Sequence, residues 1–206
     1  MIDEGYIKFN CNWTPAPPLL AEAITTLNAC RQRLFQLGLI GAYENGIGYG
    51  NISQRLEGER FVISGSATGN MAVLDESHYS LVHRVNVAKN EVYCAGPIKA
   101  SSESMSHAII YKENPNIQAV IHVHHLGMWQ KLLDKIPTTA ANVSYGTPEM
   151  AAEIVRLMRE SNLLKKKLFV TAGHEEGIFT FGEDINTAEQ LLFHKFKEHE
   201  LNAHKK

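Results

Sequence analysis

The stretch Ala119-Val120-Ile121-His122-Val123-His124-His125 places three histidines at the end of an apolar, β-branched run. Such a run predicts a β-strand. Side chains alternate between the two faces of a strand, so His122 and His124 share one face and His125 takes the other. Two imidazoles on one face can reach one cation, and neutral imidazole suits zinc and its first-row neighbours. From this stretch alone, a polar strand end without a metal remains an alternative.

The composition is that of an ordinary soluble protein. The chain has 206 residues with 44% hydrophobic and 20% charged residues, and we expect one domain over residues 1–206. A net charge of −2 gives no electrostatic footprint for nucleic acid, and no apolar run approaches the length of a membrane span. Residues 1–12 lack the apolar core of a signal peptide, and three widely spaced cysteines form no disulfide framework. These observations predict a cytoplasmic protein without nucleic-acid or membrane partners.

Apolar periodicity predicts strands and helices that are mixed along the chain. A short, weakly alternating strand is expected at residues 3–9, and the glycine-rich segment 41–51 is expected to be a loop. Clearer strands are predicted at 50–56, 60–64, 79–87, 91–94, 119–124, 168–171 and 177–181. Helices are predicted at 19–39, from 101 or 102 to about 113, at 127–133, 147–162 and 187–202.

Two segments have the composition of anion sites. Residues 64–70 are all small or polar, which leaves backbone N–H groups and hydroxyls accessible, although a simple solvent turn explains them equally well. Ser101 and Ser102 precede a helix, where either is a good N-cap and where free N–H groups suit a phosphate. Glu103 would lie in the first turn of that helix, where complementing the helix dipole is its simplest role.

A third potential metal ligand follows a different strand. His174 lies at a strand end, far in sequence from His122 and His124 but in the same kind of place. Three protein ligands with one open position are the catalytic rather than the structural form of a zinc site. An open divalent ion can hold the oxygens of a carbonyl or an enediolate, and Glu103 is the candidate to move a proton at the adjacent carbon.

Six short motifs occur in one order between about residues 20 and 198: Gly50-Asn51-Ile52-Ser53, Ser64 to Gly69, Ser101-Ser102-Glu103, His122-Val123-His124, Tyr145-Gly146-Thr147, and His174 with Gly177-Ile178. Each motif is weak alone, but the ordered set resembles the class II aldolase/adducin head-domain family, of which fuculose-1-phosphate aldolase is a well-known member. The resemblance implies an α/β fold, a three-layer α/β/α sandwich with a central, mostly antiparallel sheet. It also implies a homotetramer with fourfold symmetry and active sites between subunits.

The same resemblance assigns roles to individual residues. It implies Zn²⁺, or another divalent first-row metal, on His122, His124 and His174. Glu103 would be a metal ligand in the resting state and the acid/base in catalysis. The substrate phosphate would lie at Asn51, Thr68, Gly69, Ser101 and Ser102.

The chain departs from the family pattern at two places. The family usually has histidine directly before glycine at the third ligand, whereas His174-Glu175-Glu176-Gly177 inserts two residues, so Glu176 is an alternative ligand. The family's aldolases also carry a proton-donating tyrosine in a longer segment before the Tyr-Gly-Thr motif. Residues 136–145 are short and hold no counterpart, although Tyr145 is a possible substitute.

The favoured function is a metal-dependent, aldolase-type lyase that acts on a small phosphorylated ketose through a metal-stabilised enediolate. One alternative is a sugar-phosphate dehydratase that resembles methylthioribulose-1-phosphate dehydratase and uses the same site. Another is a non-catalytic, adducin-like binding module, which the presence of three histidines and Glu103 disfavours. The identity of the sugar phosphate is not encoded in loops of Ser, Thr and Gly.

Overall fold

The computed structural model describes residues 6–203, and within them one eight-stranded sheet dominates. Its strand order is β1-β7-β6-β5-β4-β8-β10-β9, in which β1 and β7 are parallel and every other neighbouring pair is antiparallel. The strands are β1 (Asn10–Pro15), β4 (Asn51–Arg55), β5 (Phe61–Ser64), β6 (Tyr79–Asn86), β7 (Glu91–Gly96), β8 (Ala119–His124), β9 (Leu168–Val170) and β10 (Gly177–Gly182). The structure therefore confirms an α/β fold on a large, mostly antiparallel sheet.

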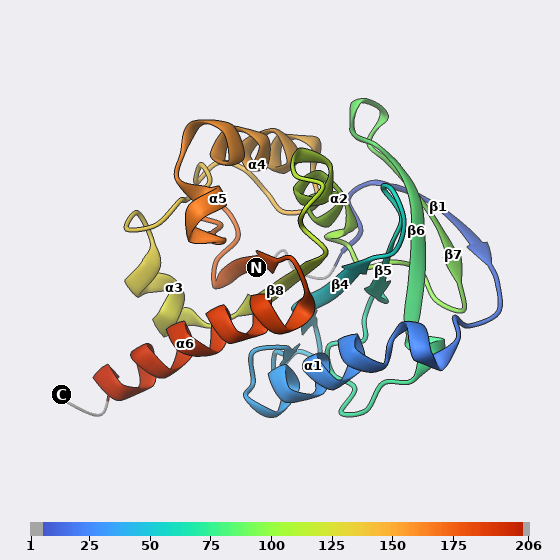
Figure 1. Ribbon diagram of the computed structural model, residues 1–206, viewed down its shortest axis with the longest axis horizontal. Helices are drawn as coiled ribbons and strands as arrows, with labels where there is room; N and C mark the ends of the chain where they lie inside the picture. The colour runs from blue at the N-terminus through green and yellow to red at the C-terminus, as the bar shows by residue number, and fades with distance from the viewer. Residues whose placement is uncertain (1–5, 204–206) are drawn as a thin grey trace.

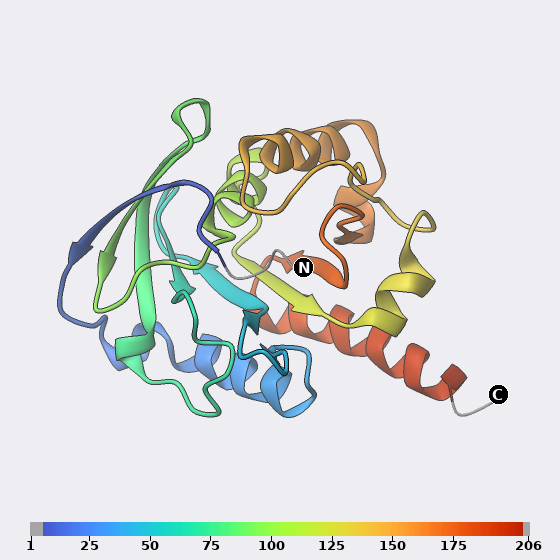
Figure 2. The ribbon, with the colours of Figure 1, turned by 180° about the vertical axis from the view of Figure 1, so that it is seen from behind.

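Helices lie on both sides of this sheet (Figures 1 and 2). The α-helices of the described residues are α1 (Thr25–Gln36), α2 (Ser104–Glu113), α3 (Leu126–Leu132), α4 (Pro148–Glu160), α5 (Leu163–Lys166) and α6 (Ile185–Ala203). In both views α1 and α6 run along one side of the sheet, while α2 and α4 pack together on the other. A strict three-layer sandwich stays a prediction. No helix in residues 6–203 combines the length and hydrophobicity needed to cross a bilayer.

Strand β8 lies in the middle of the sheet, between β4 and β10, and all six of its residues are buried. Its apolar side chains divide between two cores, as alternation requires. Val120 packs with residues of α2 and α4, whereas Ile121 and Val123 pack with residues of α1 and α6. His122 and His124 share the face of Val120, so they point toward the side of the sheet that carries α2 and α4.

Most predicted elements are confirmed, with bounds that differ by a few residues. The predicted position of the first strand was wrong. The strand is β1 at Asn10–Pro15, because pairing with the distant strand β7 determines where it forms. Of the expected strand at 3–9, residues 3–5 lie outside the described part. The loop at 41–51 also contains a small hairpin, β2 (Gly41–Ala42) with β3 (Gly48–Tyr49).

The start of α2 also differs from the prediction. The N-cap position is Glu103, not Ser101 or Ser102, and its side chain accepts no capping hydrogen bond. Ser101 instead forms a turn before the helix: its Oγ accepts a hydrogen bond from the backbone N–H of Glu103 at 3.3 Å, and its carbonyl accepts one from Ser104 Oγ at 2.7 Å. The Glu103 carboxylate is thereby free to point away from the helix axis.

Candidate metal site and adjoining polar pocket

Three buried histidines come together at one end of the sheet. His122 and His124 lie on β8, and His174 lies in the turn between β9 and β10. Their rings are 4.8–5.3 Å apart between centroids, and one potential ligand atom from each lies within 4.8 Å of the others. All three residues are at most 5% exposed. The strand thus places two histidines on one face, as strand alternation predicts, and the turn brings the third to them.

The turn that carries His174 is held by Thr171 and Gly177. Thr171 Oγ1 donates to the His174 carbonyl at 2.8 Å, and the Gly177 N–H donates to the same carbonyl at 3.1 Å. A Cβ on Gly177 would lie 2.3 Å from Thr171 Oγ1 and 3.2 Å from His174 Nδ1, so only glycine fits. The turn accommodates the two inserted residues, Glu175 and Glu176, because Glu176 adopts a left-handed backbone conformation with φ of 67°.

The imidazoles of His122 and His124 are oriented by partners on one ring nitrogen. Tyr43 Oη lies 2.8 Å from Nδ1 of His124 and also donates to Glu176 Oε2 at 3.0 Å. Nδ1 of His122 lies 3.3 Å from Asn51 Nδ2. The buried Nε2 atoms of both histidines have no hydrogen-bond partner among the described residues. Buried polar atoms are normally satisfied, so these nitrogens fit a ligand outside the chain.

The charge state of the histidines suits a metal. Burial lowers the pKa of His122 and of His124 well below the usual range, and the neighbouring histidines lower it further. Both rings are therefore neutral at physiological pH, which is the form that coordinates metals. Three imidazoles with an adjacent carboxylate match the donor set of a catalytic zinc site. His174 rather than Glu176 is the third member of the cluster. Glu176 Oε2 is 3.9 Å from His124 Nδ1 and accepts a hydrogen bond from Tyr43, which lies next to both.

Glu103 lies against this cluster from the side of α2. Its Oε2 is 2.5 Å from His122 Nδ1, and its Oε1 is 3.5 Å from His174 Nδ1. Neither carboxylate oxygen makes a well-aligned hydrogen bond among residues 6–203, although the nearby Asn51 amide favours the charged form of the carboxyl. Burial raises the pKa of the Glu103 carboxyl, with His174 and His107 opposing that rise. A divalent ion would lower it again, because a nearby cation favours the carboxylate.

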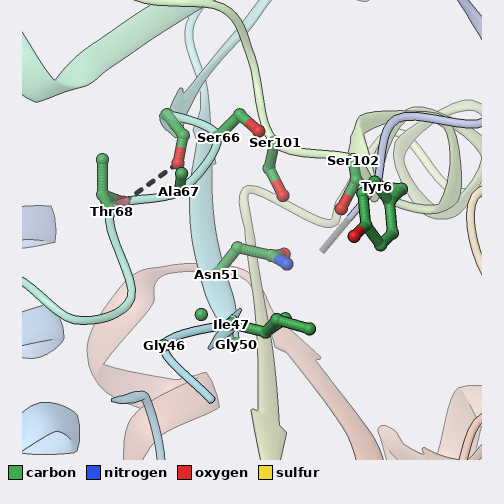
Figure 3. A pocket seen from close by; sticks show the side chains of 12 residues that line it. Tyr6, Gly46, Ile47, Gly50, Asn51, Ser66, Ala67, Thr68, Ser101 and Ser102 are labelled. Atoms are coloured by element: carbon green, nitrogen blue, oxygen red, sulfur yellow. Dashed lines mark hydrogen bonds between the residues drawn. The ribbon is translucent and has the colours of Figure 1, made fainter. Parts of the chain in front are cut away.

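A polar pocket of about 210 Å³ adjoins the histidine cluster (Figure 3). The hydroxyls of Ser101 and Ser102 point into the space above the Asn51 amide, with Thr68 on one side and Tyr6 on the other. Asn51 also touches His122, so the pocket and the cluster share a wall. Pockets for drug-sized ligands are usually larger, at about 300–1,000 Å³, so this one suits a small polar molecule.

Four of the five residues predicted to hold phosphate line this pocket, and Gly69 does not. Gly69 packs behind the loop, where an added Cβ would lie 2.3 Å from the Gly41 carbonyl and 2.9 Å from the Tyr49 nitrogen. The neighbouring residues 65–67 line the pocket in its place. The small residues of 64–70 are therefore explained partly by the pocket and partly by close backbone packing.

Some site residues have no clear signal in the sequence. Tyr43 lies in a glycine-rich segment expected to be a loop. Lys8 and Tyr6 precede the first strand, yet Lys8 Nζ lies 3.9 Å from the ring centroid of Tyr145 and donates to Ser144 Oγ at 2.5 Å. Tyr145 in turn packs against His174 with 4.6 Å between ring centroids, and its hydroxyl accepts the Tyr6 N–H at 3.0 Å. The segment before β1 therefore forms one side of the site.

The fold and site together define a class of protein. A mostly antiparallel sheet carries a three-histidine cluster, a buried glutamate and a polar pocket, the arrangement expected of a metal-using α/β enzyme family. The chain belongs to the class II aldolase and adducin N-terminal domain family, whose sequence profile matches residues 27–194. Class II aldolases use a divalent metal, and members of the family act on substrates of the sugar-phosphate kind.

Individual relatives agree with this assignment. The 3-oxo-tetronate 4-phosphate decarboxylase of Haemophilus influenzae is 33% identical over 182 residues, covering 76% of this chain and 79% of the relative. An L-fuculose 1-phosphate aldolase structure shares 17% identity with a TM-score of 0.65, covering 91% of this chain and 89% of the other. A sugar-phosphate aldolase from Thermotoga maritima has 18% identity and a TM-score of 0.64, covering 87% and 93%. At these identities the solved structures support the fold alone.

Proposed function

We propose that this protein is a metal-dependent lyase that breaks a carbon–carbon bond in a small phosphorylated keto compound. The observation that carries the proposal is the cluster of three buried histidines beside buried Glu103, in which the Nε2 atoms of His122 and His124 have no hydrogen-bond partner within the described residues. Such a cluster costs stability unless something completes it, which argues against a non-catalytic, adducin-like role.

His122, His124 and His174 are the residues that would hold the metal, which we propose to be Zn²⁺ or another divalent first-row ion. When bound, the ion would supply Lewis-acid charge that polarises the carbonyl group of the substrate. Asn51, Thr68, Ser101 and Ser102 would hold the phosphate through hydroxyl and amide groups. In this proposal the phosphate occupies the polar pocket, and the reacting carbons lie toward Glu103.

Glu103 would move the proton in the reaction. Burial raises the pKa of its carboxyl, which favours the protonated form that a general acid requires. Cleavage leaves an electron pair on the carbon next to the carbonyl group. Glu103 then gives that carbon a proton and is reprotonated from solvent before the next turnover.

Decarboxylation of a phosphorylated 3-oxo acid is the favoured reaction within this class. In it the bond to the carboxyl carbon breaks, CO₂ leaves with no hydroxyl proton to remove, and only the remaining carbon needs a proton. Aldol cleavage also requires a base for a hydroxyl proton, and the short segment 136–145 holds no counterpart of the family's tyrosine. The Tyr145 hydroxyl is held by the Tyr6 N–H. The Haemophilus relative, a decarboxylase, supports the same choice.

Product analysis of the zinc-loaded protein tests the proposal. The substrates are a phosphorylated 3-oxo acid, a panel of ketose 1-phosphates and a methylthioribulose phosphate. CO₂ release supports decarboxylation, and an aldehyde fragment supports aldol cleavage and overturns our choice between them. A dehydrated diketone would mean that the protein is a dehydratase. No product, together with no metal bound on titration, would favour the adducin-like binding module.

Assembly and location are part of the same proposal. A homotetramer with sites between subunits follows from the family resemblance, and light scattering coupled to size-exclusion chromatography measures it directly. A monomer that is fully active would contradict shared sites. The cytoplasm is the location that we propose, because three free cysteines, two of which have sulfur atoms 3.9 Å apart without a disulfide, suit a reducing compartment.

A further inference from the structure

Arg31 is a buried cation behind the loop that forms one wall of the polar pocket. It lies on α1 and is 1% exposed. Its Nη2 donates to the Thr68 carbonyl at 2.9 Å and more weakly to the Gly69 carbonyl at 3.4 Å. The guanidinium also lies 4.7 Å from the ring centroid of Phe35. The side chain thus joins the first helix to the pocket loop.

No carboxylate within the described residues pairs with Arg31, although burying a charge without a counterion is costly. Burial lowers the pKa of its guanidinium, but arginine remains protonated at neutral pH. Arg33, two residues further along the same helix, shows the usual arrangement. It is half exposed and binds both carboxylate oxygens of Glu189, at 2.6 and 2.7 Å.

The pocket on the other side of the loop has the complementary property. None of the described residues that line it carries a charge. Thr68 lines the pocket, yet its carbonyl, which would repel an anion, is turned toward Arg31. Ala67 adopts a left-handed backbone conformation with φ of 60°, which is strained for a residue with a Cβ. The loop is therefore held in a conformation that presents its carbonyl groups to the buried cation.

We propose that Arg31 is a positioning residue for the anionic group of the substrate, acting through the loop and supplying the positive charge that the pocket wall lacks. A phosphate dianion in the pocket would serve as the counterion of Arg31, which has no carboxylate partner within the described residues. The inference rests on the proposed function, because it concerns the phosphate of that substrate. It adds a residue that lies outside the phosphate motifs of the sequence.

Calorimetric titration of inorganic phosphate into the full-length, zinc-loaded protein tests this role without turnover. We expect Arg31→Met to weaken phosphate binding by roughly 10-fold or more, because it removes a buried positive charge that acts on the phosphate across the low-dielectric interior. Arg33→Met is the matched control, since it removes the same charge from the same helix, and its phosphate affinity should match the wild type. Equal weakening in both variants would overturn the proposal.

The charge-conserving variant separates electrostatics from a purely structural role. Arg31→Lys keeps the cation but loses the planar fork, and we expect it to recover most of the affinity that Arg31→Met loses. It also provides the answer if Arg31→Met does not fold. The wild type should bind phosphate more tightly as the dianion forms between pH 6 and 8, and Arg31→Met should lose part of that preference. A uniform loss at every pH, or no recovery in Arg31→Lys, would mean that Arg31 only supports the loop.

The two proposals fail in different ways. If wild type binds phosphate, Arg31→Met does not, and no substrate of the panel reacts, the proposed lyase activity is wrong while the role of Arg31 stands. If the wild type turns over substrate but Arg31→Met binds phosphate equally well, the role of Arg31 is wrong and the lyase stands. Wild-type protein that binds no phosphate would overturn the role of Arg31 directly.

Discussion

Two groups of histidines lie at the end of β8, on opposite faces of the sheet, and in both the potential ligand atoms fall within 4.8 Å of one another. The first group is His122, His124 and His174, all buried. The second is His125 with His199 and Glu200, all partly exposed. Proximity therefore does not distinguish them, but their burial and the charges around them do.

In the second group one ring nitrogen, Nδ1 of His125, is committed to structure, whereas Nδ1 of His199 has no hydrogen-bond partner within the described residues. Nδ1 of His125 accepts the Met128 N–H at 3.1 Å and so caps α3, and its ring contacts Phe196 of α6. Burial and the nearby Lys131 lower the pKa of His199, and the same positive charge would repel a metal ion. The side chain of His199 is only 12% exposed. One residue step at the end of β8 thus separates a candidate metal site from a helix cap.

Removing a ligand from the first group is expected to have the largest effect. His174→Ala should weaken zinc binding by roughly 1,000-fold, since each ligand contributes several kcal/mol to a site of this kind. His199→Ala is the matched variant in the second group, and its zinc content should equal that of the wild type. Metal content after dialysis against a weak chelator, measured by mass spectrometry, compares them.

The same measurement decides between the two candidate third ligands. Glu176→Gln keeps the acceptor for Tyr43 and removes only the carboxylate charge, so we expect zinc affinity to change by less than about 10-fold. If Glu176→Gln loses zinc while His174→Ala retains it, the third ligand is Glu176 and the cluster of three imidazoles is not the metal site.

Glu103→Gln should give the second largest effect, now on turnover. The amide cannot transfer a proton, so kcat should fall by about 100-fold or more while zinc content stays near one ion per chain. Steady-state kinetics on whichever substrate the product screen identifies gives kcat. Glu103→Asp is the control, because it keeps a carboxyl group and should retain more activity. Near wild-type turnover by Glu103→Gln would remove Glu103 from the acid/base role.

The difference between the two groups also shows what a sequence can predict. Strand alternation is local, so the opposite directions of His124 and His125 follow from the order of residues alone. The contact between Tyr43 and His124 joins residues 81 positions apart, and no local sequence pattern predicts it. The same holds for β1, whose position depends on β7, and for Arg31, which looks like any arginine of an amphipathic helix.

His107 is a third kind of histidine, buried near the first group but bonded through Nδ1 to Ser53 Oγ at 2.6 Å. Burial lowers its pKa to about 3. Between pH 6.5 and 3 the unfolded chain therefore binds a proton that the folded chain does not, so stability falls as the pH falls. The loss from this residue at pH 5 is about 2 kcal/mol.

Urea unfolding in the presence of a chelator measures this loss, so that metal release does not contribute. The free energy of unfolding should fall between pH 7.5 and 5, with buried His122 and His124 adding in the same direction. His107→Gln keeps a polar partner for Ser53 and cannot titrate in this range. Its free energy of unfolding should therefore fall by about 2 kcal/mol less than that of the wild type. Equal losses in the two proteins would mean that His107 is charged in the folded state.

The smallest effect belongs to the second group and concerns stability alone. His125→Ala removes the side chain that caps α3, which should lower the free energy of unfolding by about 1 kcal/mol. His125→Asn restores an acceptor at the cap and should recover most of that loss. Urea unfolding gives both values, and zinc content should remain that of the wild type in both variants. If His125→Ala lost zinc, the two faces of β8 would be coupled, and the separation of a metal site from a helix cap within one strand would fail.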